Sequence, residues 1–342
     1  MKFLKFILKL FLIGFLPLLA IDSARKLDLI FDPRSKNAYI ATIIDKTKML
    51  ATVPSPRLVL MSGSSMAFGI NSDMLENEIG LPVVNAALHF NFGSKYMMEE
   101  LKTYLKKGDV VLITLEYMVR SEGKYEEQLI AADFYPPSQK WIHFPSITEK
   151  ISSYTTHRLT DCRLMIGEAL NHSRSKPISI ADTTSIFYRN CFSPKGDLLC
   201  HLNNPPTKIV YPTIPSDQDF SQQIKDLNDF YAFAQQKGAK VFFTFPCLAQ
   251  KSFEENANII KKISAQIKRH LKIPILGTPQ YALMDDTLFY DNAYHPNDKG
   301  REIFTKRILT LFENSDKFQK SIQSIRTKKQ EPLASNINSK NK

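Results

Sequence analysis

The sequence predicts an α/β fold with a mostly parallel central sheet and helices on both of its faces. Short apolar runs that resemble buried strands alternate with stretches of helical periodicity. Gly108-Asp109 and Lys237-Gly238 stand directly before two of these runs, as helix stops that feed buried strands. With 342 residues, the chain is long enough to bury a large core, as one elaborated domain or two small ones.

The expected elements follow one another in a regular order. The pattern predicts strands at residues 58–61, 82–86, 110–115 and 240–245, and a weaker one at 273–276. It predicts helices at residues 72–79, 94–106, 221–236, 254–270 and 297–313. We therefore expect the α/β domain to cover residues 57–315.

The regions outside this alternation have their own composition. Residues 25–56 indicate a membrane-proximal stalk with one helical patch, and Pro54-Ser55-Pro56 ends it. Residues 118–215 predict a long insertion, with a helix over about 147–169, placed over the strand ends as a lid or substrate wall. Residues 316–342 lose periodicity and are predicted to be a disordered basic tail.

The positive charge of the chain is concentrated at its ends. Of the net charge of +11, Lys2, Lys5 and Lys9 supply +3. Residues 316–342 supply +5, from seven basic residues against two acidic ones. A nucleic-acid-binding protein usually carries its basic stripe on the fold, so we expect no nucleic-acid partner.

The N-terminal segment is the most apolar part of the chain. Residues 10–21 read LFLIGFLPLLAI and follow Lys2, Lys5 and Lys9. An uncleaved membrane anchor and a cleaved signal peptide both fit this pattern. Cleavage after Ala20 or Ala24 would put Leu18 or Asp22 at position −3, which favours a transmembrane anchor over residues 1–24. The lysines would then be cytoplasmic and the body of the chain outside.

Two of the four cysteines are candidates for a disulfide. Cys191 and Cys200 flank the turn-forming stretch FSPKGDLL, which a bridge would close into a loop or hairpin. An exported compartment allows such a bridge. No CxxC motif or histidine spacing accompanies the cysteines, so we expect no metal site and no cofactor.

The candidate active site begins at the turn Gly63-Ser64-Ser65, after the first predicted strand and before a helical stretch. α/β enzymes hold nucleophiles on such sharp strand-to-helix turns. In this hypothesis Ser65 attacks a carbonyl, His295 takes its proton, and Asp291 holds the imidazole in the required tautomer. The alternative is an ordinary connection in which a serine caps the helix, His295-Pro296 begins another helix, and Asp291 caps a turn.

The Gly-x-Ser turn and the late Asp291…His295-Pro296-Asn297 motif together resemble the SGNH (GDSL-like) hydrolase superfamily. The closer resemblance is to membrane-anchored proteins of the bacterial envelope, such as D-alanyl-lipoteichoic-acid transfer proteins and alginate-type O-acetyltransferases. It covers residues 58–116 and 240–312 and implies a three-layer, flavodoxin-like SGNH sheet. It also implies that Ser65 is the nucleophile and that the Ser65 N–H and the Ala86 N–H contribute to the oxyanion hole. Asn85 is either a further donor to that hole or a structural hydrogen-bonding residue. The sequence has Leu115-Glu116-Tyr117 where the family carries an oxyanion asparagine.

The resemblance implies a serine esterase or O-acyltransferase that acts through an acyl-serine on an envelope polysaccharide or another hydroxyl-rich acceptor. It places a single-pass protein in the bacterial inner membrane, with its body periplasmic and its N-terminal helix in lipid. A membrane-bound acyltransferase is a possible partner. The absent asparagine supports an alternative, a non-catalytic SGNH-like scaffold that binds a surface polymer or that acyltransferase. A nucleotide-binding protein ranks last because Gly63 stands without a glycine-rich phosphate loop.

Overall fold

A computed structural model describes residues 2–26, 37–172 and 186–330 of the chain. The chain divides into two compact units. The first draws on residues 1–39 and 144–188, and the second draws on residues 40–143 and 189–342. The second unit is the α/β domain and contains every predicted catalytic residue.

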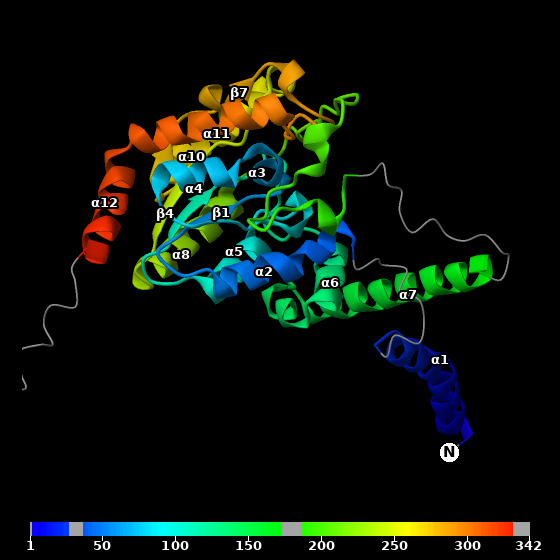
Figure 1. Cartoon of the computed structure of the whole chain (residues 1–342). Helices are drawn as coiled ribbons and strands as arrows, with labels where there is room; N and C mark the ends of the chain where they lie inside the picture. Colours follow the sequence, from blue (N-terminus) through cyan, green and yellow to red (C-terminus); the bar gives the residue numbers. More distant parts are fainter. Residues whose placement is uncertain (1, 27–36, 173–185, 331–342) are drawn as a thin grey trace, which may run out of the picture. The chain divides into compact units, whose positions relative to one another are not determined.

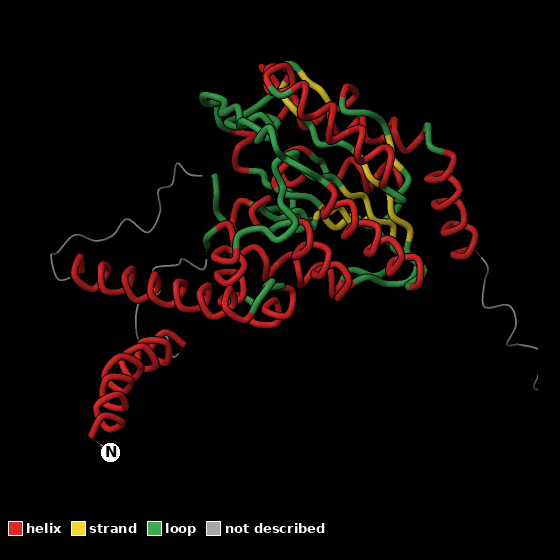
Figure 2. Tube along the Cα trace, turned by 180° about the vertical axis from the view of Figure 1, so that it is seen from behind, coloured by secondary structure: helices red, strands yellow, loops and turns green. Residues whose placement is uncertain are grey.

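Five parallel strands form the central sheet of this domain, in the order β2-β1-β3-β4-β6 (Figure 2). They are β1 (Leu58–Met61), β2 (Val83–Asn85), β3 (Val110–Ile113), β4 (Lys240–Thr244) and β6 (Ile275–Leu276). Each strand lies inside a predicted run, so the predicted α/β class with a parallel sheet is confirmed. A second, two-stranded parallel sheet pairs β5 (Leu248–Ala249) with β7 (Leu283–Met284).

Helices cover both faces of the central sheet (Figure 1). The helices α4 (Ser72–Ile79) and α11 (Asp298–Glu313) lie on one side, and α5 (Ser94–Tyr104) and α8 (Ser221–Gln236) lie on the other. Every residue of β1 and β3 is consequently buried, as the unbroken apolar runs required. The remaining helices of the domain are α2 (Ile43–Thr52), α3 (Ser64–Gly69), α6 (Tyr125–Phe134), α9 (Gln250–Glu255), α10 (Ala257–His270) and α12 (Asp316–Gln330).

Capping residues fix the ends of the two helices nearest the candidate site. The Asn71 side chain accepts a hydrogen bond from the Met74 N–H at the start of α4, and Gly80 ends that helix in the left-handed region at φ 69°. Asn297 caps α11 by accepting from the Gly300 N–H. Gly300 has no room for a side chain, since a Cβ there would lie 2.1 Å from the Leu288 carbonyl oxygen.

Two regions predicted to lie outside the domain belong to it. In the predicted stalk, α2 buries Ile43, Lys46, Thr47 and Leu50. The predicted disordered tail begins instead with α12, and Phe318 stacks on Phe312 with ring centroids 3.8 Å apart. The helical patch predicted within the stalk is therefore part of the domain, and residues 316–330 are helical where a disordered tail was predicted. A few apolar residues on one face suffice for a helix that packs against a domain. Residues 331–342 lie outside the described part of the chain.

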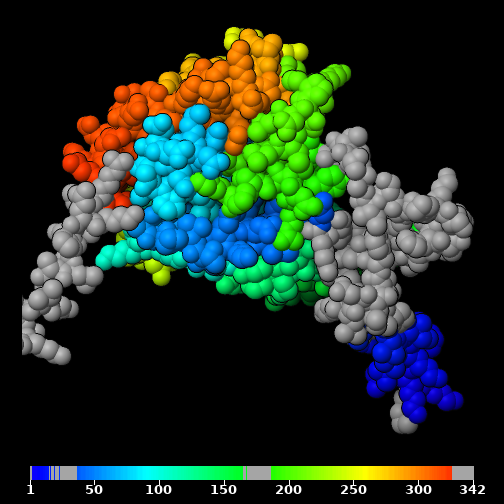
Figure 3. All heavy atoms as spheres, viewed as in Figure 1, coloured from blue at the N-terminus to red at the C-terminus, as the bar shows by residue number. Residues whose placement is uncertain are grey.

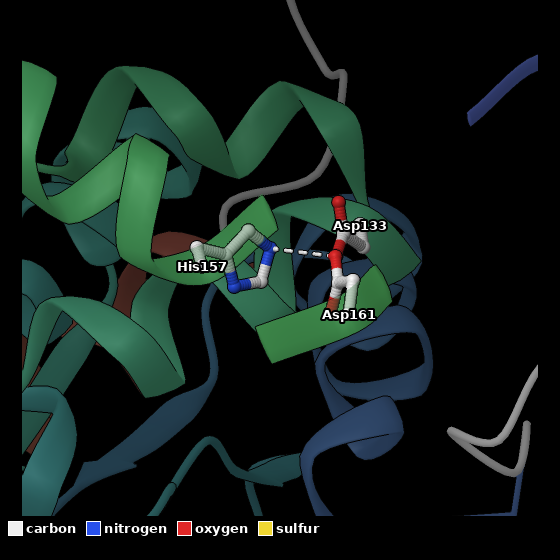
Figure 4. Close-up of side chains that lie close together, drawn as sticks. All are labelled: Asp133, His157 and Asp161. Atoms are coloured by element: carbon white, nitrogen blue, oxygen red, sulfur yellow. Dashed lines mark ion pairs between the residues drawn. The ribbon is translucent and has the colours of Figure 1, made fainter. Parts of the chain in front are cut away.

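The first unit contains α1 (Lys2–Lys26) and α7 (Ile147–His172). In α7, His157 and Asp161 lie one turn apart, with 3.7 Å between Nε2 and Oδ2 (Figure 4). α7 extends the helix predicted in the insertion by one turn. Only residues 144–188 of that insertion belong to this unit, and the rest of residues 118–215 folds with the α/β domain.

α1 covers the segment that was predicted to be a transmembrane anchor. None of the helices in the described ranges is long and apolar enough to cross a membrane. The predicted transmembrane helix is therefore not found. Only twelve uncharged residues separate Lys9 from Asp22, whereas a helical span takes about 20 apolar residues.

Two ionisable side chains, Lys46 and Glu100, are buried inside the domain. Lys46 Nζ donates to the carbonyl oxygens of Asn85 and Gly196, each at 3.0 Å. Burial lowers the pKa of Lys46 to about 7, although Asp197, Glu100 and Asp45 raise it. Burial raises the pKa of Glu100 to about 8, against the opposing effect of Lys46.

These two groups are expected to give the free energy of unfolding a minimum near neutral pH. Glu100 loses its proton near pH 4.5 when unfolded but near 8 when folded, so stability falls as pH rises across that interval. Lys46 stays protonated up to 10.5 when unfolded but only to about 7 when folded, so stability rises from there to 10.5. Urea unfolding between about pH 5 and about pH 10 measures both slopes. Glu100→Gln should remove the falling slope, and a variant that kept it would contradict this assignment.

Candidate active site

The candidate site lies at the topological switch point of the sheet, where successive strands are added first on one side of β1 and then on the other. From β1 the chain moves outward to β2, then returns to β3 on the other side of β1. In open parallel sheets, ligands bind at the carboxyl ends of the two strands that flank this switch point. Ser64 follows β1 there, and Glu116 follows β3.

Ser64, His295 and Asp291 form a continuous hydrogen-bonded chain. Ser64 Oγ lies 2.9 Å from His295 Nε2, and His295 Nδ1 lies 2.8 Å from Asp291 Oδ1. Because a carboxylate can only accept, His295 carries its proton on Nδ1, and Nε2 is left to accept from the Ser64 hydroxyl. Ser64 is 5 % exposed and His295 8 %, so the pair is nearly closed to water. The arrangement is that of a nucleophile, a base and an orienting carboxylate.

The loop before α11 holds His295 in place. The His295 N–H donates to the Asn292 carbonyl oxygen, and the His295 carbonyl oxygen accepts from the Tyr290 N–H. Phe68, on the helix that begins with Ser64, stacks on the imidazole with ring centroids 3.8 Å apart and an interplanar angle of 5°. The ring is therefore fixed by backbone bonds on its own loop and by an aromatic face from α3.

The structure gives the contact with His295 to Ser64 and not to Ser65. Ser65 is fully buried, and its hydroxyl pairs with the Ser62 hydroxyl at 2.8 Å. The Ser65 N–H, predicted to be an oxyanion donor, donates instead to Glu116 Oε1 at 2.8 Å. Successive helical residues point about 100° apart, so only one of two adjacent serines can face the histidine. The predicted contact between Ser65 and His295 is therefore not present, and Ser64 stands in its place.

The other two predicted oxyanion residues are also engaged elsewhere. Asn85 Nδ2 donates to the Met66 carbonyl oxygen at 3.0 Å and to Asp197 Oδ1 at 2.8 Å. The Ala86 N–H donates to the Leu60 carbonyl oxygen at 3.0 Å and so extends the pairing of β2 with β1. In this structure both residues are buried, and these hydrogen bonds lie within the domain.

The loop from Cys191 to Cys200, which a disulfide closes, contacts the helix α3 that begins with Ser64. The two sulfur atoms are bonded, so the structure contains the predicted bridge. Inside the loop, the Leu198 N–H donates to the Ala67 carbonyl oxygen of α3. Figure 3 shows the green atoms of this part of the chain beside the cyan atoms of the region that contains α4. The insertion therefore contributes to the site through its last third.

Asp197, within that loop, joins three parts of the scaffold. Its carboxylate accepts from the Ser72 N–H at 2.8 Å and the Ser72 hydroxyl at 2.5 Å. It also accepts from Asn85 Nδ2 and from Arg301 Nη2, the latter at 2.9 Å. Asp197 is 2 % exposed and Arg301 7 %, so these charges compensate each other in the interior. Asp197 thereby links α4, β2 and α11.

A second histidine, His201, lies behind the first. It is fully buried, and its Nε2 donates to the Pro296 carbonyl oxygen at 3.0 Å, one residue after His295. Burial lowers the pKa of His201 to about 4, and the charges of His295 and Arg301 lower it further. At neutral pH His201 is therefore uncharged, and it donates a hydrogen bond to the loop that precedes α11.

A cavity of about 660 Å³ lies at the opposite end of the sheet. It is lined by the first residues of β4, by the end of α8 and by α12, with Lys240, Lys317 and Lys320 among its walls. The serine–histidine pair follows the carboxyl ends of the strands, whereas this cavity lies at their amino ends. The cavity therefore shares no residue with the candidate active site.

Three residues of the site were not predicted from the sequence, namely Asp197, His201 and the role of Glu116. Asp197 and His201 come from the irregular insertion, where neither strand nor helix periodicity indicates which side chains turn inward. Glu116 did carry a signal, because it directly follows the strand predicted at residues 110–115. A search of protein-family models found no match for the chain, and no curated protein matched it either.

Proposed function

We propose that this chain is a serine esterase or O-acyltransferase that works through an acyl-Ser64 intermediate. The observation that carries the proposal is the hydrogen-bonded chain from Ser64 through His295 to Asp291. This combination activates a serine hydroxyl for attack on an ester carbonyl. The proposal retains the reaction class and the SGNH-type fold that the sequence resemblance implies, with the nucleophile moved by one residue.

The reaction proceeds in two steps. His295 Nε2 takes the Ser64 proton as Oγ bonds to the carbonyl carbon, and the imidazolium then gives this proton to the departing alcohol oxygen. Asp291 keeps the proton on Nδ1 and stabilises the imidazolium. In the second step, water or a sugar hydroxyl loses its proton to His295 and attacks the acyl carbon. His295 then returns this proton to Ser64 Oγ as the bond between Oγ and the acyl carbon breaks. Water gives hydrolysis, and a sugar hydroxyl gives transfer.

The proposal needs at least one donor for the negative charge that develops on the carbonyl oxygen. The first N–H groups of a helix have no acceptor within that helix. In α3 the Ser65 N–H is used by Glu116, whereas the Ser64 N–H has no acceptor among the described residues. We assign the Ser64 N–H as the oxyanion donor, and one such donor is worth about 10²–10³ in rate.

The proposed substrate is an ester on an envelope polysaccharide or another hydroxyl-rich polymer. The Cys191–Cys200 disulfide supports an oxidising compartment outside the cytoplasm. In that compartment, surface glycans are the abundant hydroxyl-bearing acceptors. A membrane-bound acyltransferase that supplies the acyl group remains part of the proposal.

Lipid contact through α1 is also proposed, as association with a membrane surface. α1 exposes large apolar side chains, among them Phe3 at 74 % and Ile13 at 73 %, together with Lys2, Lys5 and Lys9. Exposed apolar surface beside lysines suits an anionic lipid interface. The full chain is expected to float with phosphatidylglycerol vesicles. The double variant Phe3→Ser, Ile13→Ser should lower the fraction of protein that floats. Equal flotation of the variant would contradict a role for these side chains.

A non-catalytic scaffold is the second candidate function. It is favoured by the engagement of the Ser65 N–H, Asn85 and Ala86, which leaves fewer oxyanion donors than an SGNH hydrolase normally has. Such a protein would bind the polymer, or the acyltransferase, without turning over an ester.

Covalent labelling by a fluorophosphonate distinguishes the two candidates. An activated serine attacks the phosphorus atom and expels fluoride, which leaves a stable adduct. The enzyme is expected to gain one adduct, mapped by peptide mass spectrometry to Ser64. A folded, disulfide-bonded protein that gains none would favour the scaffold.

A further inference from the structure

Glu116 occupies the space beneath the turn that carries Ser64. It follows β3 by three residues, and its side chain is buried, with 2 % of the residue exposed. Oε1 accepts the Ser65 N–H at 2.8 Å, so the carboxyl group is bonded to the residue directly after the proposed nucleophile. No other hydrogen bond to the Glu116 side chain is found in the described ranges.

The same carboxyl group explains why residue 63 is glycine. A Cβ at Gly63 would lie 2.4 Å from Glu116 Oε2 and 2.6 Å from Oε1. Gly63 has φ −68°, so a positive φ is not what requires glycine here. Close packing against Glu116 does. The turn and the carboxyl group therefore fit each other on two sides.

Glu116 also affects two buried ionisable groups, Tyr294 and Cys247. Oε2 is buried and has no hydrogen-bond partner in the described part of the chain, and the same is true of the Tyr294 hydroxyl. Burial raises the pKa of Tyr294, and the charges of Tyr117 and Glu116 raise it further. Burial likewise raises the pKa of the Cys247 thiol, with Glu116 as the next cause. Glu116 is thus close to the residue that precedes His295 as well as to the one that follows Ser64.

We infer that Glu116 is a positioning residue that sets the register between Ser64 and His295. It holds the first turn of α3 through the Ser65 N–H and fills the space against which Gly63 packs. This inference rests on the proposed esterase or acyltransferase function, which it deepens. Glu116 stands at the switch point where the SGNH pattern would supply an oxyanion asparagine, so here a donor has been exchanged for an acceptor that shapes the turn.

The test compares Glu116→Ala and Glu116→Gln by the rate of fluorophosphonate labelling. Glutamine keeps an oxygen for the Ser65 N–H and the same volume, so Glu116→Gln is expected to label at nearly the wild-type rate. Alanine removes both, and a nucleophile displaced by about 1 Å loses up to about 100-fold, so Glu116→Ala should label at least about tenfold more slowly. Gly63→Ala, which pushes the carboxyl group away, should show the same loss if Glu116→Ala fails to fold.

Glu100 offers a matched control. It is another buried glutamate, 1 % exposed, whose Oε1 also has no partner among the described residues. Glu100→Ala should alter stability but leave the labelling rate of folded protein unchanged. Wild-type labelling by Glu116→Ala, or equal losses in Glu116→Ala and Glu100→Ala, would overturn the inference.

A wild-type protein that does not label would refute the proposed function and not the positioning role. Hydrogen exchange then decides, since it needs no activity. Glu116→Ala should speed exchange of the amides at residues 62–69, while Glu100→Ala should not. Unchanged exchange in Glu116→Ala would overturn the inference.

Discussion

Ser64→Ala is expected to abolish the fluorophosphonate adduct and ester turnover, whereas Ser65→Ala is expected to keep both. Ser64 Oγ is the hydroxyl bonded to His295 Nε2, so its removal leaves the base without a nucleophile. The Ser65 hydroxyl contacts Ser62, and its loss costs one buried hydrogen bond. Intact-mass measurement of labelled protein checks both outcomes directly. An adduct retained by Ser64→Ala and lost in Ser65→Ala would restore Ser65 as the nucleophile.

The size of the effect distinguishes chemistry from folding. Removing a general base such as His295 typically costs about 10²–10⁴ in rate, and removing the nucleophile costs at least as much. Ser65→Ala, by contrast, should destabilise the fold by about 1 kcal/mol. Urea unfolding of both serine variants supplies the control, because neither should lose enough stability to unfold.

Asp197→Ala is expected to lower the free energy of unfolding by about 3–5 kcal/mol. The substitution leaves the buried Arg301 guanidinium without its carboxylate, and it removes the acceptor of Ser72 and Asn85. An uncompensated charge in the interior costs more than the lost hydrogen bonds themselves. Urea denaturation at constant pH measures the change.

Asp73→Ala is the matched control for Asp197→Ala. Asp73 pairs with Lys195 at 3.1 Å, but its side chain is 76 % exposed. Exposed ion pairs contribute about 0–1 kcal/mol, so this variant should remain close to the wild type. Equal losses in both aspartate variants would show that Asp197 is not the buried link described above.

The sequence predicted the framework of the domain because buried parallel strands leave a simple signal. LVLM at residues 58–61 and VVLI at residues 110–113 are unbroken apolar runs, and both became central strands. Helix stops and caps then fixed the alternation. The sequence also predicted that His295 and Asp291 lie near the turn after β1, since a loop that leads into a helix of such a fold lies at the carboxyl edge of the sheet.

The choice between Ser64 and Ser65 could not be made from local sequence. Both are small residues at the start of one helix, and which of them faces His295 depends on how Gly63 packs against Glu116. That contact joins residues 53 positions apart in the chain. Asp197 was not predicted for a related reason. Its partners come from three separate elements, and no periodic pattern in the sequence indicates that its side chain is buried.

In the predicted tail, the sequence pattern failed to indicate a helix that the structure contains. The tail's loss of periodicity suggested disorder, yet Phe318 and Ile322 lie one turn apart and are buried against the domain. Two apolar residues among basic ones give little periodicity in the sequence, yet their burial is enough to hold this helix against the domain.

The Cys191–Cys200 bridge also affects how the protein should be produced. The segment that it closes holds Asp197 and the Leu198 N–H against the elements that carry Ser64 and Arg301. Protein expressed in a reducing cytosol would be purified with the Cys191–Cys200 disulfide reduced. If such a sample were inactive, the missing disulfide would explain the result. The free thiols should therefore be counted before labelling or ester turnover at Ser64 is measured.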